Sequence, residues 1–337
     1  VLSFMQFTTV ASKFSRTTLR ALNTGPSTSG QVRIIYSDKF LEHKDTTYHP
    51  ECPDRLKWTV PKLKSIQGID WRTPTSSYSK EREQLALEYI KKVHDPDYVE
   101  EIQKLSGQGG GRLDYDTYVN AETYEVAVLA ACAWLDAVDS AVKEGTPAFA
   151  LTRPPGHHAL RGTGMGFCIF NFAAIAARYA CEHHSLARIA LLDWDVHHGN
   201  GVQYLLKEDE RMRYCSLHEE GNFPGSGRAN DQGPIGNLLN IPLPPYTKWD
   251  MYKPQFEEKA IPFLKEFDPD LLIISAGYDG MDEDELSYMR LQPEDFNVMS
   301  AFVKERFGKR VIWGLEGGYN VHELHKAVGA TISPYLA

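Results

Sequence analysis

The chain has 337 residues, of which 42% are hydrophobic and 24% are charged, and its formal net charge is −9. No apolar run approaches the roughly 20 residues that a helix needs to cross a bilayer, so we expect no membrane span. An acidic protein is a poor partner for nucleic-acid phosphates, so we expect no direct nucleic-acid binding. The five cysteines are scattered and none forms a C-x-x-C pair, which argues against a disulfide framework and a cysteine zinc site.

Residues 1–30 differ in composition from the rest of the chain. They carry three basic residues and eleven serines or threonines but no acidic residue. This composition is typical of an organellar transit peptide, and a disordered tail is the alternative. We therefore expect a chloroplast or mitochondrial location, with the cytoplasm or nucleus as the alternative. Without those three positive charges, the total of −9 becomes −12 for residues 31–337.

Strand-like and helix-like segments alternate from residue 32 onwards, as expected for one α/β domain with a mostly parallel sheet. The amino-terminal half is predicted to contain a strand at 32–36, a His/Pro-rich loop at 49–55, helices at 56–66, 81–93, 95–105 and 120–143, and a glycine-rich loop at 107–111. The later strand-like runs, with helical stretches between them, are 148–151, 189–192, 213–217, 238–243, 271–275 and 311–315.

The most informative segment runs from residue 189 to residue 201. Its apolar start has the length and branching of a buried strand, and it ends on Asp193, Asp195 and His197. Residues two apart in an extended chain project to the same side, so these side chains can face one spot. Two carboxylates and an imidazole crowded together cost desolvation energy unless a cation lies between them. The segment therefore predicts a metal site, with aspartates that cap a following helix as the alternative.

Polar side chains also follow three other predicted strands, at the edge where parallel sheets bind ligands. His157 and His158 follow 148–151, Asp279 follows 271–275, and Tyr319 follows 311–315. Each of these motifs alone also fits a structural loop, but their convergence at strand ends favours a functional site.

Together these residues suggest metal-assisted hydrolysis of an amide. A catalytic zinc takes three protein ligands and keeps a position for water, and the candidate ligands are Asp195, His197 and Asp279. A histidine that is neutral near pH 7 is a well-matched general base, which His157 or His158 could supply. Tyr319, on a glycine turn, could donate a hydrogen bond to an oxyanion.

Five motifs, in uninterrupted order, resemble the zinc-dependent histone deacetylase family in its class II and acetoin-utilisation-like branch. They are R-P-P-G-H-H-A, G-F-C-I-F-N, D-W-D-V-H-H-G-N-G, S-A-G-Y-D and L-E-G-G-Y-N. The resemblance covers roughly residues 32–330 and, with the amino-terminal segment, is greatest to plant deacetylases of the organellar kind. It implies that residues 31–337 form one deacetylase domain. The implied fold is the three-layer arginase/deacetylase α/β fold with a mostly parallel eight-stranded sheet.

The resemblance also implies the ions and their ligands. Zinc would be held by Asp195, His197 and Asp279. A structural monovalent cation, usually potassium, would lie close by, with the matching residues Asp193, Ser216 and Leu217, together with Asp195 and His197.

The resemblance implies roles for the two histidines and the tyrosine as well. His158 would be the general base for the attacking water, His157 would help to protonate the leaving amine, and Tyr319 would stabilise the oxyanion. Asp193 would orient His157, and Asn200 would orient His158. Some relatives carry an aspartate in place of Asn200, and a neutral amide raises imidazole basicity less. We therefore expect a lower pKa for His158 than for His157.

The substrate-binding residues that the family implies are Gly166, Phe167, Phe223 and Leu286. The two phenylalanines match the aromatic walls of an acetyl-lysine tunnel. Leu286 stands where polyamine-specific relatives carry a glutamate, which argues against polyamine as the main substrate. The acidic run at 282–285 is expected near the tunnel rim, where it either attracts cationic peptides and amines or is a plain solvated loop.

These residues predict a zinc amidohydrolase that removes acetyl groups from lysine side chains of proteins, histones or others. Alternatives are a deacetylase of small N-acetylated amines and an arginase-like dimanganese ureohydrolase. The ureohydrolase would need more Asp or His ligands, where this chain has Asn200 and glycines. A non-catalytic acyl-lysine binder would need neither the histidine pair nor Tyr319. Nothing in the sequence indicates an oligomeric state.

Overall fold

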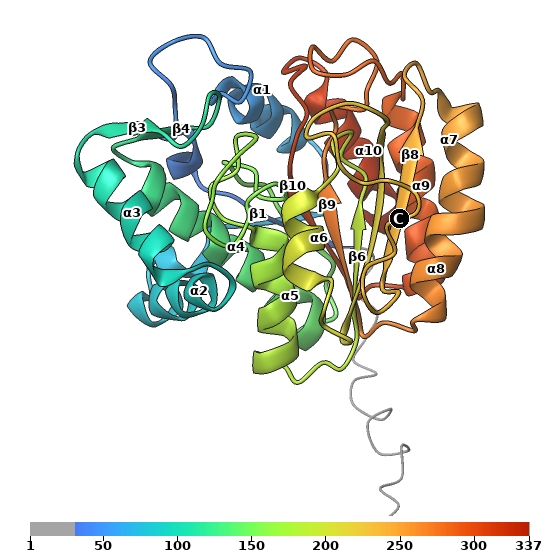
Figure 1. Ribbon diagram of the computed structural model, residues 1–337, viewed down its shortest axis with the longest axis horizontal. Coiled ribbons are helices and arrows are strands. Elements are labelled where there is room, and N and C mark those ends of the chain that lie inside the picture. The colour runs from blue at the N-terminus through green and yellow to red at the C-terminus, as the bar shows by residue number, and fades with distance from the viewer. Residues whose placement is uncertain (1–30, 337) are drawn as a thin grey trace, which may run out of the picture.

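Eight parallel strands form the central sheet of the computed structural model, which describes residues 31–336 (Figure 1). The predicted fold class is confirmed. Across the sheet the strands are β2 (Ile69–Arg72), β1 (Val32–Ile35), β5 (Ala148–Ala150), β10 (Val311–Leu315), β9 (Leu271–Ala276), β6 (Ile189–Asp193), β7 (Met212–Glu219) and β8 (Leu238–Leu243). The predicted transit peptide or tail, residues 1–30, lies outside the described residues.

Two local features differ from the predicted elements. Strand β2 has no counterpart among the predicted strands, because it is an edge strand without a buried apolar run and pairs only with β1. The predicted loop at 107–111 is wrong for Gly110 and Gly111, which belong to β3 (Gly110–Arg112) in an antiparallel pair with β4 (Tyr118–Asn120). Gly110 has φ +108°, and a Cβ there would collide with the backbone of Val119, so only glycine fits this pairing.

The four helices predicted in the amino-terminal half are present with shifted ends. They are α1 (Asp54–Leu63), α2 (Lys80–Val93), α3 (Pro96–Gly107) and α4 (Thr123–Lys143). The later helices are α5 (Phe172–His183), α6 (Asn200–Leu206), α7 (Trp249–Gln255), α8 (Ile261–Glu266), α9 (Pro293–Phe307) and α10 (Leu324–Leu336). The described residues also form two short 3-10 helices, η1 (Asp38–Leu41) and η2 (Thr75–Ser77), and one π-helix, η3 (Phe256–Ala260). None of the described helices combines the length and the apolar character that a membrane span requires.

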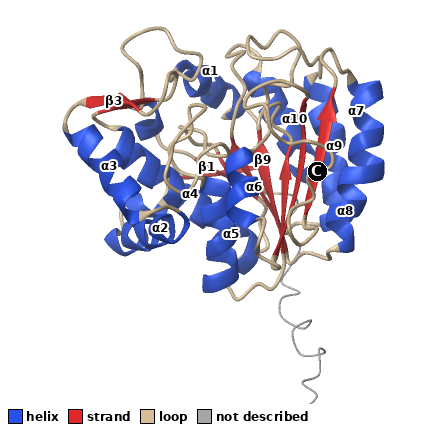
Figure 2. Cartoon of the chain, viewed as in Figure 1, coloured by secondary structure: helices blue, strands red, loops and turns tan. Residues whose placement is uncertain are grey.

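Helices cover both faces of the sheet (Figures 1 and 2). Helices α4 and α5 pack on one face and α8 and α10 on the other. Adjacent residues of β10 face opposite sides of the sheet and contact different helices. Gly314 gives room to Trp134 of α4, with which any Cβ would collide, while Trp313 packs against Tyr335 of α10 at a ring-centroid distance of 5.0 Å. Because both faces are covered, the central strands are continuous apolar runs rather than alternating ones.

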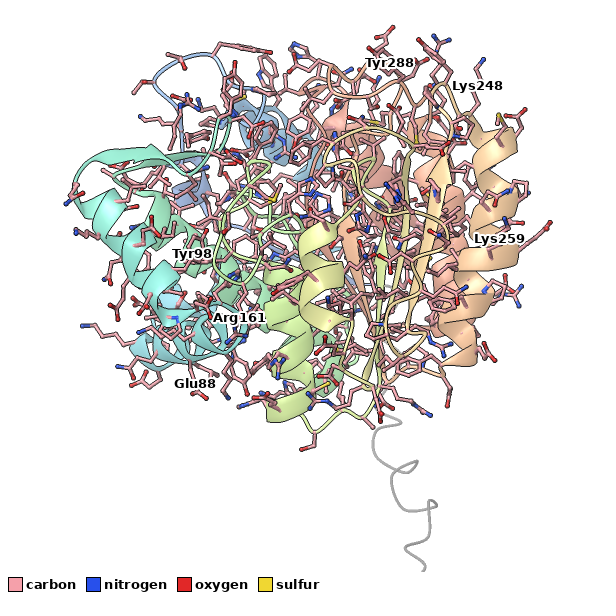
Figure 3. All side chains as sticks on the ribbon, viewed as in Figure 1. Glu88, Tyr98, Arg161, Lys248, Lys259 and Tyr288 are labelled. Atoms are coloured by element: carbon pink, nitrogen blue, oxygen red, sulfur yellow. The ribbon has the colours of Figure 1, made fainter. Side chains whose placement is uncertain are left out.

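The carboxyl ends of the parallel strands all point to one edge of the sheet, which lies at the top of the view in Figures 1 and 2. Tyr288, from the loop that follows β9, lies at this same upper edge in Figure 3. The loops after β5, β6, β9 and β10 therefore bring their polar residues to one place.

Candidate metal centre and active site

Asp195, His197 and Asp279 meet at the carboxyl edge of the sheet. The first two follow β6 and the third follows β9, its neighbour in the sheet. His197 Nδ1 lies 3.1 Å from Asp195 Oδ1 and 3.0 Å from Asp279 Oδ2. All three side chains are buried, and one ligand atom from each lies within 4.8 Å of the others. The predicted ligand set is thus brought together.

The charges of Asp195, His197 and Asp279 favour the binding of a cation. Burial alone would lower the pKa of His197, but the carboxylates of Asp279 and Asp195 outweigh it and raise that pKa well above its usual value. Burial and the charge of Asp195 raise the pKa of Asp279. Gly277 and Gly317 leave space beside the carboxylates that a Cβ would fill. Two carboxylate oxygens and an imidazole nitrogen are a donor set that suits zinc, so the residues present fit a divalent ion.

The alternative that the aspartates cap a helix is wrong. Helix α6 begins at Asn200 after the N-cap Gly199, and no side chain caps it. Asp193 instead contacts two other side chains. Its Oδ2 accepts a hydrogen bond from Tyr214 (2.9 Å) and lies 3.2 Å from His157 Nδ1.

His157 and His158 lie side by side, with ring centroids 4.0 Å apart. His157 has Asp193 on Nδ1 and lies 3.7 Å from Asp195 through Nε2. His158 Nδ1 lies 2.7 Å from Asn200 Oδ1. Asp193 and Asn200 therefore stand where the resemblance implies.

The two imidazoles have opposite pKa shifts. Burial would lower the pKa of His157, but Asp195 and Asp193 outweigh it and raise the pKa to about 10. Burial and the two neighbouring imidazoles hold the pKa of His158 well below its usual value. The expectation that His158 has the lower pKa is confirmed. A protonated and a neutral imidazole thus lie next to each other at neutral pH.

Glu316 holds the histidine loop, although the L-E-G-G-Y motif alone did not assign it a role. Its Oε2 accepts hydrogen bonds from the backbone N–H groups of Gly156 (2.6 Å) and His157 (3.1 Å). With Cys168 and His157 it forms a second group of potential ligand atoms. Because its carboxylate already accepts from the backbone, we interpret Glu316 as a structural anchor.

Tyr319 is buried beside the metal-ligand group, on the turn after β10. Burial raises its pKa well above the usual value, so the phenol keeps its proton and can donate a hydrogen bond. The guanidinium of Arg55 lies 4.8 Å from the centre of the Tyr319 ring and donates to the carbonyl of Gly318 at 2.8 Å. Arg55 ends the His/Pro-rich loop, which carried no assigned role in the sequence.

The predicted aromatic walls flank these groups. The Phe167 ring lies edge-to-face with Tyr319 at 5.6 Å, and the Phe223 ring lies edge-to-face with His158 at 4.9 Å. Phe167 has φ 69°, an unfavourable conformation for a bulky residue. Its N–H donates to the hydroxyl of buried Thr117 at 3.0 Å, which stabilises that conformation.

Gly166, Leu286 and the predicted monovalent-cation residues also lie at this edge. A Cβ on Gly166 would be 2.6 Å from His158 Cδ2 and 2.7 Å from Phe223 Cε1. The carbonyl of Leu286 accepts from Asn222, the residue before Phe223, at 3.1 Å. In the sheet, Asp193 of β6 is paired with Ser216 of β7, and Leu217 follows it.

Five residues hold the site through hydrogen bonds that the sequence did not predict, although Asp284 lies in the acidic run and Glu316 in the L-E-G-G-Y-N motif. Their partners are mostly backbone groups far away in the sequence, so no local pattern marks these contacts. They are Arg55, Thr117, Tyr214, Asp284 and Glu316.

Comparisons with known proteins agree with this architecture. The histone deacetylase domain family model matches residues 49–334. The chain is 44% identical over 309 residues to an uncharacterised protein of Synechocystis, covering 90% of this chain and 99% of that protein. It is 34% identical to the Arabidopsis thaliana protein named histone deacetylase 14, chloroplastic, covering 90% of this chain and 77% of that one. The crystal structure of the HDA15 HD domain superposes with a TM-score of 0.82 at 29% identity, covering 90% and 91% of the two chains.

The fold and the buried carboxylate–imidazole site define a hydrolase of the arginase/deacetylase architecture. With a family match over most of its length, the chain belongs to the histone deacetylase family.

Proposed function

We propose that this chain is a zinc-dependent amidohydrolase that removes acetyl groups from lysine side chains of proteins. The observation that supports the proposal is the buried group of Asp195, His197 and Asp279 beside two histidines of opposite pKa shift. Zinc held by these three residues would supply Lewis-acid activation of the acetamide and of water.

His158 is the general base in this proposal. Asn200 Oδ1 accepts from Nδ1, so the proton of the neutral ring lies on Nδ1 and Nε2 can accept a proton from the attacking water. His157 keeps its proton because of Asp193 and Asp195 and delivers it to the leaving amine. Neutral base and charged acid are thus assigned by their surroundings.

Tyr319 and the two phenylalanines bind the acetyl-lysine. The Tyr319 hydroxyl donates to the oxygen that gains negative charge as the amide carbon becomes tetrahedral. The rings of Phe167 and Phe223 pack on either side of the lysine methylene chain and exclude water. Gly166 leaves space for the chain beside His158, and Leu286 forms part of the rim.

Two further parts of the proposal concern the second ion and the location. A potassium ion is expected where Asp193, Ser216 and Leu217 adjoin in neighbouring strands. The acid-free composition of residues 1–30 and the likeness to a protein named as chloroplastic support a plastid, with a mitochondrion as the second choice. In an organelle, proteins other than histones are the substrates.

Small N-acetylated amines are the second candidate substrate class, because they carry the same acetamide. Leu286 offers no charge to a polyamine, which favours the protein substrate. A dimanganese ureohydrolase is disfavoured because the Asn200 amide is engaged with His158 and offers no additional carboxylate. A binder without catalysis would not need a paired acid and base.

The test compares zinc-loaded wild-type protein with Tyr319→Phe on an acetyl-lysine peptide and on acetylated small amines. We expect peptide hydrolysis by the wild type and a kcat at least roughly 100-fold lower in Tyr319→Phe, because an oxyanion donor is lost. The matched control is Tyr335→Phe, a buried tyrosine whose hydroxyl has no hydrogen-bond partner among the described residues. Negligible peptide turnover beside rapid amine turnover would overturn the protein-substrate proposal.

A further inference from the structure

Asp284 differs from the other members of the acidic run at 282–285. Its exposed fraction is 6%, whereas Asp282, Glu283 and Glu285 are exposed. The expectation of a uniformly rim-exposed or solvated run is therefore wrong at Asp284. A buried carboxylate needs hydrogen-bond donors or a counter-charge, and the donors here come from two separate segments.

The carboxylate of Asp284 joins the Tyr319 turn to the rim loop, which we define as residues 282–288. Asp284 Oδ2 accepts hydrogen bonds from the backbone N–H groups of Tyr319 (2.7 Å) and Asn320 (3.1 Å). Its Oδ1 accepts from the N–H of Leu286 at 3.1 Å. Three backbone N–H groups therefore donate to one carboxyl group, two from the Tyr319 turn and one from the rim loop.

The Tyr319 turn is also held before the tyrosine, where the N–H of Gly317 donates to Asp195 Oδ2 at 2.8 Å and its carbonyl accepts from Tyr278 at 3.0 Å. Gly317 and Gly318 precede the tyrosine, and Gly318 has φ +117°, so this stretch has no side chains with which to pack. Arg55 holds the carbonyl side of the turn through Gly318. Asp284 holds the N–H side at the tyrosine itself.

The rim loop is tied in turn to the segment that carries Phe223. The carboxylate of Glu219 accepts from Asn222 Nδ2 at 3.2 Å and from the N–H of Tyr288 at 2.8 Å. Asn222 also donates to the carbonyl of Leu286. Tyr288 is labelled at the upper edge of the molecule in Figure 3. The Asp284 hydrogen bonds therefore connect the oxyanion donor to the rim.

We propose that Asp284 is a positioning residue for deacetylation, which fixes the backbone of Tyr319 so that the hydroxyl meets the substrate oxygen. The inference rests on the proposed function. Its physical basis is that an oxyanion donor contributes only when it is held at the position that the charge reaches. A misplacement of about 1 Å can cost roughly 100-fold in rate. Loss of Asp284 therefore lowers kcat and leaves KM largely unchanged.

The test is a double-mutant cycle of Asp284→Asn and Tyr319→Phe, with kcat and KM measured on the acetyl-lysine peptide. Asparagine keeps the size but replaces one oxygen with an amide N–H₂, which cannot accept from the backbone. We expect kcat to fall roughly 10-fold or more in the wild-type background. In the Tyr319→Phe background, the same substitution should change kcat by less than about 2-fold, because coupled residues are non-additive.

Asp295→Asn is the matched control. Asp295 is also a buried aspartate that accepts a backbone hydrogen bond, from Gln292 at 2.7 Å, but it caps α9. It should lower Tm without lowering kcat. Equal losses of kcat in Asp284→Asn and Asp295→Asn would overturn the inference, and so would an additive cycle.

A measurement on the wild-type protein covers the case in which Asp284→Asn does not fold. The amides of Tyr319 and Asn320 should exchange hydrogen slowly, and rapid exchange at both would overturn the inference. The two proposals fail differently. A wild type inactive on the peptide overturns the proposed function and this inference with it, whereas an active wild type with a normal Tyr319→Phe loss and an additive cycle overturns only the role of Asp284.

Discussion

Two buried polar clusters lie at the carboxyl edge of the sheet, and they balance their charges in different ways. The first, the arginine cluster, consists of His43, Glu51, Arg55, Tyr118 and Arg153. Its single carboxylate, Glu51, receives both a bidentate hydrogen bond from Arg153 (2.5 and 2.6 Å) and one from Arg55 (3.2 Å). The guanidinium charges outweigh burial and hold the pKa of Glu51 well below its usual range.

The second, the metal-centre cluster, consists of Asp193, Asp195, His157, His197 and Asp279. It holds three carboxylates, and within residues 31–336 their only ion-pair partners are imidazoles. In the arginine cluster, two guanidinium groups balance the charge of Glu51, so this cluster needs no added cation. In the metal-centre cluster only imidazoles face the three carboxylates, and this difference supports the proposal that a metal ion binds there.

Removal of a metal ligand should have the largest effect. Asp279→Asn withdraws one of two carboxylate ligands, so zinc binding weakens and the Lewis acid is lost. We expect kcat/KM to fall by more than about 1,000-fold, or about 4 kcal/mol of transition-state stabilisation. Elemental analysis should show the zinc gone. Full zinc content with full activity in Asp279→Asn would contradict the assignment.

A substitution in the arginine cluster should affect stability and leave metal binding unchanged. Arg153→Met removes the bidentate partner and leaves Glu51 buried with a weaker counter-charge. Breaking a buried ion pair in this way costs about 3–5 kcal/mol of unfolding free energy. The second substitution Glu51→Gln should recover part of the lost unfolding free energy, because it removes the buried charge. Chemical denaturation measures the loss, and a change below about 1 kcal/mol would show that the arginine cluster is not the self-balanced unit described above.

A buried histidine outside both clusters extends the comparison, because burial outweighs the charge of the neighbouring Asp95 and disfavours its protonated form. His94 Nδ1 lies 3.2 Å from the carbonyl of Arg161, and Nε2 accepts from the N–H of Asn171 at 2.9 Å. Burial lowers its pKa to about 4, below the roughly 6.5 of an unfolded chain. Between these values the unfolded state binds more protons, so stability falls as the pH drops from about 6.5 towards 4.

The variant His94→Gln should remove this contribution. Between pH 7.5 and pH 5 the wild type should lose about 2 kcal/mol more unfolding free energy than His94→Gln, when both are measured in urea. Parallel pH profiles for the two proteins would show that folding does not lower the pKa of His94.

The smallest effect is expected from a charge added beside the base. Asn200→Asp places a carboxylate at His158 Nδ1 and should raise the pKa of His158 by about one unit or more. As the proposed general base, His158 would work only when unprotonated, so the acid limb of kcat/KM should move to higher pH by the same amount. Asn297→Asp, on α9, controls for the added charge. An unmoved acid limb would mean that another group sets it.

The sequence predicted the parts of this protein that lie close together along the chain. The β6 segment shows both its apolar run and its candidate metal ligands within a few residues, and seven of the eight sheet strands match predicted runs. Strand β2 is missing from those predictions because an edge strand needs no buried run. The roles of Asp284 and Glu316 were not predicted, because each accepts hydrogen bonds from backbone N–H groups far away in the sequence. The separations are 35 residues for Asp284 and 160 residues for Glu316, and spacing along the chain carries no signal for such contacts.

The proposed zinc site is best tested by metal reconstitution. Protein stripped of metal by a chelator is titrated with zinc while bound zinc and acetyl-lysine peptide hydrolysis are measured together. We expect hydrolysis to be absent without metal and to reach its maximum at one tightly bound zinc ion per chain. A fully folded protein that hydrolyses the peptide with no bound divalent metal would contradict the proposed zinc site.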